Sequence, residues 1–226
     1  DYASATPINK KVADLVSSYE GKFFANPSSI HKSGLEAYKV IEDARARIAS
    51  LICAHPDEII FTGSGTESDA LAIMGTVRNY KGDKIPHVVT TTIEHPAVLE
   101  VCVMLEKNKE AEVTYIDPSI EGVIDPKDIR NALKENTVLV SVMYSNNEIG
   151  TVEPIMEIAK AIRHFRKIQN SSLPFFHTDA CQAINYLPIE NIGKLGVDLL
   201  TLNSSKIYGP KGVGVLYKKR ASFVII

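Results

Sequence analysis

The fold is decided by the stretch Asp198-Leu-Leu-Thr-Leu-Asn-Ser-Ser-Lys206-Ile-Tyr-Gly-Pro-Lys-Gly-Val-Gly214. Its apolar run predicts a buried strand, and the small polar residues after it predict a turn. Lys206 comes directly after this strand, before a loop whose glycines and proline force tight geometry. A lysine held partly out of water in such a place can form a Schiff base with an aldehyde, although most lysines are solvated surface charges. Partner residues elsewhere in the chain must decide between these two interpretations.

Outward from this stretch, strands alternate with helices along the chain. Short runs rich in β-branched and aromatic residues are predicted as strands at 58–62, 87–91, 112–116, 137–143, 175–178, 198–202 and 213–217. Apolar residues at helical spacing predict helices at 9–19, 31–53, 97–107, 126–134 and 154–167, and one after the loop 63–68. This alternation predicts a three-layer α/β/α fold with a mostly parallel sheet covered on both faces. We find no repeat or linker, so we expect one domain over 1–226.

Composition narrows the possible functions. With 226 residues, 45% of them hydrophobic, the chain can bury a full core. A formal net charge of −2 gives no electrostatic reason to expect nucleic acid or an anionic membrane as a partner. No apolar run approaches the roughly 20 residues of a membrane span. Cys53, Cys102 and Cys181 are widely spaced and form no ligand pattern, so we expect no disulfide framework, no metal site and a cytoplasmic location.

A glycine-rich loop is the first candidate partner of Lys206. The segment Gly63-Ser-Gly-Thr-Glu-Ser68 follows a predicted strand and opens a helix. Its backbone N–H groups, at Gly65 and Thr66 among others, and the Thr66 hydroxyl can hold a phosphate. A plain glycine turn with Ser/Thr caps explains the same residues equally well. The segment matches neither a dinucleotide fingerprint nor a Walker loop.

Four polar residues follow other predicted strands, at the edge where ligands bind in open α/β sheets. His95 places a titratable ring there, although it could simply begin a helix. Asn147 offers an amide, and turn formation explains an Asn-Asn pair as well. Asp179 needs a cation beside it to stay ionised among apolar neighbours, with helix capping as the alternative. Gln182 could reach the same ligand.

Taken together, these residues indicate one cofactor. They provide a phosphate cup, a ring that can stack, an acid for a pyridinium nitrogen and a lysine for an aldehyde. Pyridoxal 5′-phosphate (PLP) has all four requirements, because its pyridinium must stay protonated to withdraw electrons. The combination is far more specific than any of its parts.

At this point the sequence resembles the class V aminotransferase family of fold-type I PLP-dependent enzymes, and within it the cysteine desulfurases. The matching segments run in family order and cover nearly the whole chain. They are Asp1-Tyr-Ala-Ser-Ala-Thr-Pro7, Asn26-Pro-Ser-Ser-Ile-His31, Phe61-Thr-Gly-Ser-Gly-Thr-Glu-Ser68, Glu94-His95, Asn146-Asn-Glu-Ile-Gly150, His177-Thr-Asp-Ala-Cys-Gln182 and Lys206-Ile-Tyr-Gly-Pro-Lys-Gly212.

The resemblance implies a role for each candidate. Lys206 would bind the cofactor aldehyde, Asp179 would pair with the pyridine nitrogen and His95 would stack on the ring. The phosphate contacts would come from Gly65, Thr66, Asn203 and Ser205, and contacts to the ring oxygen and substrate region from Asn147 and Gln182.

The resemblance also implies a reaction and its partners. L-cysteine would be converted to L-alanine, and an enzyme thiolate would take the sulfur as a persulfide. The sulfur would pass to an acceptor or scaffold protein, for iron–sulfur cluster or thio-cofactor synthesis. A homodimer would be the usual assembly.

Two departures from the family pattern limit what is implied. The family normally has histidine directly before the lysine and serine three residues before it, where this chain has Ser205 and Asn203. The family's persulfide cysteine, its substrate-carboxylate arginine and a phosphate contact from the dimer partner all lie well beyond the lysine, whereas this chain ends at Ile226. We therefore expect residues 1–226 to be a PLP-binding large domain that lacks its C-terminal small domain, and Cys181 to be a core residue rather than the nucleophile.

Two other functions stay open at this point. A selenocysteine lyase or another class V lyase or aminotransferase would use the same cofactor, and it would suit the altered residues before Lys206. A catalytically incomplete PLP-binding module would suit the missing second half of the site.

Overall fold

The computed structural model describes residues 1–220 and residue 222 of the chain. Its strands are β1 (Ile59–Thr62), β2 (His87–Thr91), β3 (Glu112–Ile116), β4 (Thr137–Ser141), β5 (Phe175–Asp179), β6 (Leu199–Asn203) and β7 (Gly214–Lys218). Its α-helices are α1 (Lys10–Glu20), α2 (Lys32–Leu51), α3 (Gly65–Arg78), α4 (Pro96–Lys107), α5 (Pro126–Ala132), α6 (Ile155–Gln169) and α7 (Ile192–Leu195). Single 3₁₀ turns lie at Pro56–Glu58 and Ser204–Lys206. The predicted strands and helices are present with small shifts at their ends, and only α7 was not predicted.

The strands form one mixed sheet in the order β1-β7-β6-β5-β4-β2-β3. Pairing is parallel from β6 through β5, β4 and β2 to β3, and β7 is antiparallel to both of its neighbours. A parallel connection needs a crossover of a dozen or more residues. The loop between β6 and β7 is shorter than that, so β7 must turn back along β6. The prediction of a mostly parallel sheet is confirmed.

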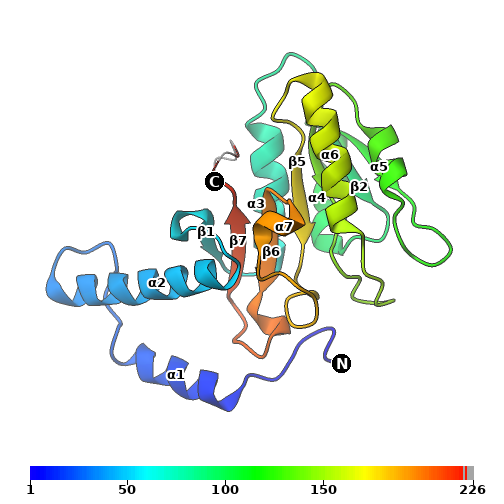
Figure 1. The fold of residues 1–226 in the computed structure, drawn as a ribbon. Helices are drawn as coiled ribbons and strands as arrows, with labels where there is room; N and C mark the ends of the chain where they lie inside the picture. Colours follow the sequence, from blue (N-terminus) through cyan, green and yellow to red (C-terminus); the bar gives the residue numbers. More distant parts are fainter. Residues whose placement is uncertain (221, 223–226) are drawn as a thin grey trace.

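Helices cover both faces of the sheet and create two apolar cores (Figure 1). On one face, α3 and α4 pack against strand residues such as Leu139 and Leu199. On the other face, α5, α6, α7 and the end of α2 pack against residues such as Val140 and Leu200. Adjacent strand residues point to opposite faces, and both are buried. This two-sided burial explains why the central strands are apolar throughout, and it confirms the three-layer architecture.

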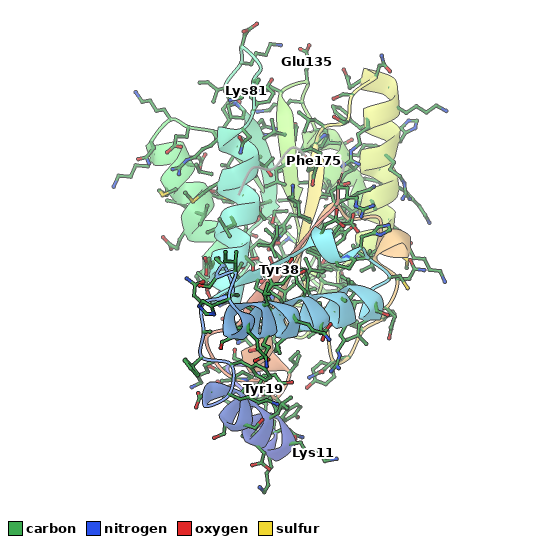
Figure 2. All side chains as sticks on the ribbon, turned by 90° about the vertical axis from the view of Figure 1, so that its left-hand side faces the viewer. Lys11, Tyr19, Tyr38, Lys81, Glu135 and Phe175 are labelled. Carbon is green, nitrogen blue, oxygen red and sulfur yellow. The ribbon has the colours of Figure 1, made fainter. Side chains whose placement is uncertain are left out.

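Helices α1 and α2 lie at one end of the molecule, apart from α5 and α6 (Figure 1). Figure 2 shows Lys11, Tyr19 and Tyr38 on these helices, with Lys81 and Glu135 at the opposite end. None of the residues of α1 is buried, and Tyr19 and Tyr38 are exposed despite their size. The sequence predicts an amphipathic α1, and the described part of the chain leaves the apolar side chains of Leu15 and Tyr19 exposed. The chain before α1 returns to the sheet and reaches the loop after β6.

No helix in the described part of the chain combines the length and the apolar character that crossing a bilayer requires.

A buried ion pair fixes the start of β6. Asp198 is 4% exposed, and its Oδ2 accepts a hydrogen bond from the Arg166 guanidinium and another from the Phe176 N–H at 2.9 Å. Lys219 lies farther away, with its Nζ 3.7 Å from Asp198 Oδ1, and its side chain is half exposed. Asp198 therefore joins β5, β6 and α6 at one buried point.

Replacing Asp198 by alanine should destabilise the protein by about 3 kcal/mol, because the change leaves a largely buried guanidinium without its counter-ion and the Phe176 N–H without its acceptor. Urea denaturation would measure the loss. The matched control is Lys219→Ala, which removes only the exposed partner and should cost less than about 1 kcal/mol. Equal losses in the two variants would show that the buried pair does not have this role.

Candidate active site

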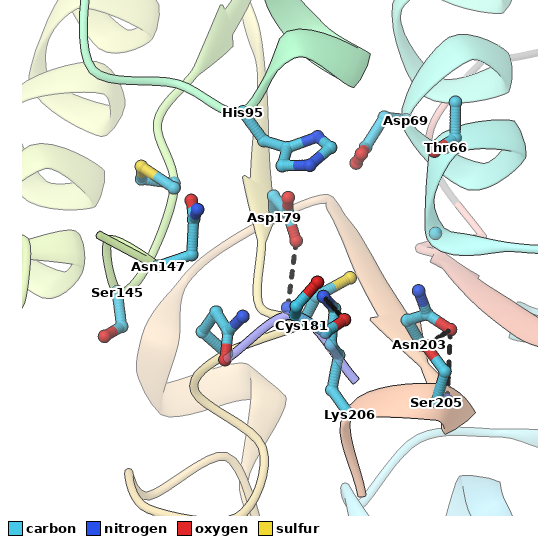
Figure 3. A pocket seen from close by; sticks show the side chains of 14 residues that line it. Thr66, Asp69, His95, Ser145, Asn147, Asp179, Cys181, Asn203, Ser205 and Lys206 are labelled. Carbon is cyan, nitrogen blue, oxygen red and sulfur yellow. Dashed lines mark hydrogen bonds between the residues drawn. The ribbon is translucent and has the colours of Figure 1, made fainter. Parts of the chain in front are cut away.

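A cavity of about 240 Å³ opens where β4, β5 and β6 end. It brings together every residue that the sequence predicted for the site: Gly65, Thr66, His95, Asn147, Asp179, Gln182, Asn203, Ser205 and Lys206. Figure 3 shows Lys206, Asp179 and His95 around this space, with Thr66 on the facing helix. These residues come from the carboxyl ends of five different strands and from the segments that follow them. They meet because the carboxyl ends of parallel strands share one edge of the sheet.

Lys206 ends the 3₁₀ turn that follows β6. Its side chain is half-buried, and Nζ donates hydrogen bonds to the backbone oxygens of Ala3, at 2.9 Å, and Ser4, at 2.6 Å. The turn is capped by Asn203, whose Oδ1 accepts from the Ser205 N–H at 3.2 Å and from the Ser205 hydroxyl at 3.1 Å. The two residues that depart from the family pattern therefore bond to each other and shape the turn that presents Lys206.

The glycine-rich loop forms the N-terminus of α3. Ser64 caps the helix by accepting from the Glu67 N–H at 3.1 Å, and Glu67 accepts from the Gly63 N–H at 2.6 Å. Gly65 and Thr66 are the first helical residues, whose N–H groups have no acceptor within the helix. A Cβ on Gly65 would lie 2.8 Å from the sulfur of Cys181, so only glycine fits this close approach. The two interpretations of this loop, a capped glycine turn and a phosphate-binding site, are therefore compatible with one structure.

Asp179 is the last residue of β5 and is 7% exposed. One of its oxygens, Oδ1, accepts a hydrogen bond from the Cys181 N–H at 2.9 Å. This bond closes the turn after β5 and holds the carboxylate at the cavity wall. The next described helix is α7, which begins at Ile192, so the helix-capping alternative is not what the structure shows.

A second buried acid, Asp69, lies on α3 and faces the same cavity (Figure 3). Among the described residues its Oδ1 has no hydrogen-bond partner, and it lies 3.6 Å from Nε2 of His177. Burial raises the pKa of Asp69 well above its usual value, and the charge of Asp179 adds to this effect. Burial also lowers the pKa of His177 to about 3, which leaves that imidazole neutral. Burial thus favours the uncharged form of both the Asp69 carboxyl group and the His177 imidazole.

The three remaining polar candidates also lie at the cavity. His95 caps α4, because its Nδ1 accepts from the Ala97 N–H at 3.0 Å, and its ring still points into the cavity (Figure 3). The turn predicted for the Asn-Asn pair is made by Asn146, which accepts from two backbone N–H groups of that loop. This leaves the Asn147 side chain to line the cavity. Gln182 donates from Nε2 to the Ala3 oxygen at 2.6 Å.

Five further residues that line the cavity were not predicted as site residues from the sequence: Ser4, Asp69, Met143, Ser145 and Cys181. One signal was available for Asp69, which follows Gly65 by one helical turn and must share its face of α3. Ser145 lies two residues before Asn147 in a loop already assigned to the site. Ser4 lies in the segment 1–7, which matches the family pattern, but its residue type did not mark it, because its contact with the site depends on how the N-terminal segment returns to the sheet.

Glu94, beside His95, is a buried acid that affects stability rather than the shape of the cavity. Its Oε1 accepts from the Thr91 hydroxyl and the Met143 N–H, each at 2.8 Å. Among the described residues Oε2 has no partner. Burial raises the pKa of Glu94 to about 8 from a usual value of 4.5.

The free energy of unfolding should therefore decrease as pH rises from about 5 to 8. The Glu94→Gln variant should not show this decrease. Between these pH values the folded state keeps a proton on Glu94 that the unfolded chain has lost, so stability falls with rising pH. The slope is up to about 1.4 kcal/mol per pH unit. Urea denaturation across this range should show that the free energy of unfolding of the variant rises relative to that of the unchanged protein toward pH 8. The control Glu121→Gln changes an exposed side chain and should show the same pH dependence of stability as the unchanged protein. If Glu94→Gln also showed that pH dependence, the raised pKa assigned to Glu94 would be contradicted.

Fold and cavity together define a class: α/β proteins whose sheet edge holds a lysine, a buried acid and a helix N-terminus around one small-molecule site. The family model for class-V aminotransferases matches residues 1–224. The chain belongs to this family.

Individual relatives agree with the family assignment. The chain is 45% identical over 222 residues to the protein named "Cysteine desulfurase IscS" from Dictyoglomus turgidum, covering 98% of this chain and 54% of that protein. It is 43% identical to "Putative cysteine desulfurase IscS 1" from Bacillus subtilis, covering 97% of this chain and 55% of the relative. The chain thus spans about half the length of the curated relatives it matches.

Solved structures share the fold over nearly the whole chain. The structure titled "SspA in complex with cysteine" has a TM-score of 0.90 and 36% sequence identity, and the match covers all of this chain and 62% of that one. A structure titled "NIFS-LIKE PROTEIN" has a TM-score of 0.91 and 31% identity, with 98% of this chain and 59% of that chain covered.

Proposed function

We propose that this chain forms the cofactor-binding part of a PLP-dependent cysteine desulfurase, which converts L-cysteine to L-alanine and passes on the sulfur. One observation carries the proposal: Lys206, Asp179, His95 and the N-terminus of α3 converge on a single cavity. The names of the relatives and the cysteine in one related structure's title favour L-cysteine as the substrate.

The donor set of the cavity fits PLP. Free N–H groups at the start of a helix suit a phosphate, a buried carboxylate suits a pyridinium, and a half-buried amine suits an aldehyde. When bound, PLP supplies an aldehyde that condenses with amines and a ring that withdraws electrons from the substrate Cα.

Each residue at the cavity then has a task that its position allows. Lys206 Nζ would hold the aldehyde end, while Gly65 and Thr66 would hold the phosphate together with Asn203 and Ser205. Asp179 would keep a proton on the ring nitrogen. His95 would stack on the ring, and Asn147 and Gln182 would orient the ring oxygen and the substrate.

None of the cysteines in this chain suits the attack on the substrate sulfur. Cys181 lines the cavity, but burial beside Asp179 and Asp69 raises the pKa of its thiol well above the usual value. Burial raises the pKa of Cys102 to about 12. Cys53 is exposed beyond the end of α2 and does not line the cavity. Because the thiolate is the nucleophile, we propose that the persulfide cysteine belongs to a part of the protein outside this chain.

The partners and the location are also proposals. Sulfur would go to an acceptor or scaffold protein that serves iron–sulfur cluster or thio-cofactor synthesis. The protein would act as a homodimer, for which the exposed apolar side chains of α1 and α2, such as Leu15, Tyr19, Leu35 and Tyr38, offer a surface. The unpaired thiols support a cytoplasmic location.

Product analysis tests the proposed reaction. The full-length protein, loaded with PLP, should release alanine from L-cysteine in step with the sulfide formed in the presence of a thiol reductant. A clear preference for L-selenocysteine, or amino-group transfer to a keto acid without sulfur release, would replace the desulfurase with another class V activity. No turnover of any of these substrates would leave a PLP-binding module.

A further inference from the structure

The N-terminal segment of the chain forms part of the cavity wall and holds the lysine. Ala3 and Ser4 place two backbone oxygens against Lys206 Nζ, at 2.9 and 2.6 Å. An ammonium group has three N–H donors, and two of them are satisfied here by carbonyls from the opposite end of the sequence. Charge-assisted hydrogen bonds of this kind are among the stronger polar contacts in proteins.

These two carbonyls are held in place by contacts on either side. The Ala3 oxygen also accepts from Gln182 Nε2 at 2.6 Å, and the Ser4 N–H donates to Asp1 Oδ1 at 3.0 Å. Ser4 lines the cavity itself. The carbonyl pair is therefore oriented by its surroundings as well as by the lysine.

Thr6 joins the N-terminal segment by hydrogen bonds to the 3₁₀ turn Ser204–Lys206 and the residues just after it. Its N–H and its hydroxyl both donate to the Ser205 oxygen, at 2.9 and 3.0 Å, and the hydroxyl accepts from the Tyr208 N–H at 2.7 Å. Thr6 is 7% exposed, so water competes little with these bonds. The Asn9 N–H adds a bond to the Tyr208 oxygen at 2.9 Å. The segment and the turn are thus joined by hydrogen bonds that do not involve the Lys206 side chain.

We propose that the carbonyl oxygens of Ala3 and Ser4 form a binding site for a primary ammonium group, taken by Lys206 in this structure and by the α-ammonium of the amino-acid substrate when Lys206 holds the cofactor. The identity of the second occupant rests on the proposed function. When Lys206 Nζ is engaged with the cofactor, the two carbonyls lose their donor, and the α-ammonium of an amino acid in the cavity offers the same three N–H donors. Thr6 is a positioning residue for this site.

A binding experiment without turnover tests the site. The probe is methylammonium, and binding to the cofactor-free full-length protein is followed by saturation-transfer NMR. The Lys206→Ala variant, in which the carbonyls have lost their ammonium, should give at least a fivefold stronger signal than the unchanged protein. Tetramethylammonium has the charge but no N–H donors, and it should give no such gain. Equal signals from the two proteins, or from the two cations, would overturn the proposal.

Variants of Thr6 test whether its hydroxyl group positions the two carbonyls. Adding Thr6→Val to Lys206→Ala removes the hydroxyl with little change in shape, and it should lower the methylammonium signal at least threefold. Adding Thr6→Ser instead keeps the hydroxyl and should restore the signal. If the serine variant binds no better than the valine variant, Thr6 does not position the site.

Competition identifies the second occupant. L-alanine should displace methylammonium from the Lys206→Ala protein, whereas propionate, which lacks only the amine, should not. Displacement by propionate, or none by L-alanine, would reject an α-ammonium as the ligand. A failure of the desulfurase assignment would show in product analysis and would leave the methylammonium result intact, so the two failures are distinguishable.

Discussion

Replacing Lys206 by alanine should lower alanine production from L-cysteine by about a thousandfold or more in the full-length protein. Lys206 contributes the amine at the cavity, and removing the nucleophile of a covalent mechanism has effects of this order or larger. Reaction rates at saturating L-cysteine and PLP would measure the loss.

The control for this variant is Lys211→Ala. Lys211 lies in the same loop, but it is exposed and does not line the cavity, so its removal should leave the rate within about twofold. If Lys206→Ala retained more than a tenth of the activity, another amine would have to bind the cofactor.

Replacing Asp179 by asparagine should lower the same rate by about a hundredfold or more. The amide keeps the shape of the side chain and can still accept from the Cys181 N–H, but it has no charge to hold a proton on a ring nitrogen. Losing one preorganised electrostatic contact in a water-poor site has an effect of this order. PLP titration by absorbance, together with steady-state kinetics, would separate weaker cofactor binding from slower chemistry.

A charge-retaining variant completes the test of Asp179. Asp179→Glu displaces the carboxylate by one methylene but keeps its charge, so it should be impaired less than Asp179→Asn. A glutamate variant as inactive as the asparagine variant would indicate that position matters more than charge. An asparagine variant with normal activity would remove the pyridinium contact from the account.

Much of the fold could be predicted because the physical signals are local. The β-branched runs and the helical spacing of apolar residues locate the strands and most helices, and two-sided burial makes the central strands apolar without interruption. Strand 137–143 was predicted two residues too long. Val142 still bonds to the neighbouring strand beyond the end of β4, so apolar character continues past the regular ladder. Helix α7, with four residues, is too short for a periodic signal.

The cavity could be predicted because its residues follow the carboxyl ends of strands that lie side by side. Each candidate alone had an ordinary explanation, and some of those explanations also hold: His95 caps α4 and Ser64 caps α3, whereas Asp179 bonds within a turn. Only the match of all the candidates to one cofactor distinguished the site residues from ordinary capping and turn residues. Ser4 could not be found this way, because a carbonyl contact with Lys206 depends on the backbone path and not on residue type.

Lys206 is proposed as the residue that binds PLP, and borohydride reduction of the PLP-loaded full-length protein tests this assignment. Digestion and mass mapping then locate the phosphopyridoxyl group. The label is expected on the peptide that contains Lys206, at that residue. A label on another lysine, or no label on a protein that has bound PLP, would contradict it.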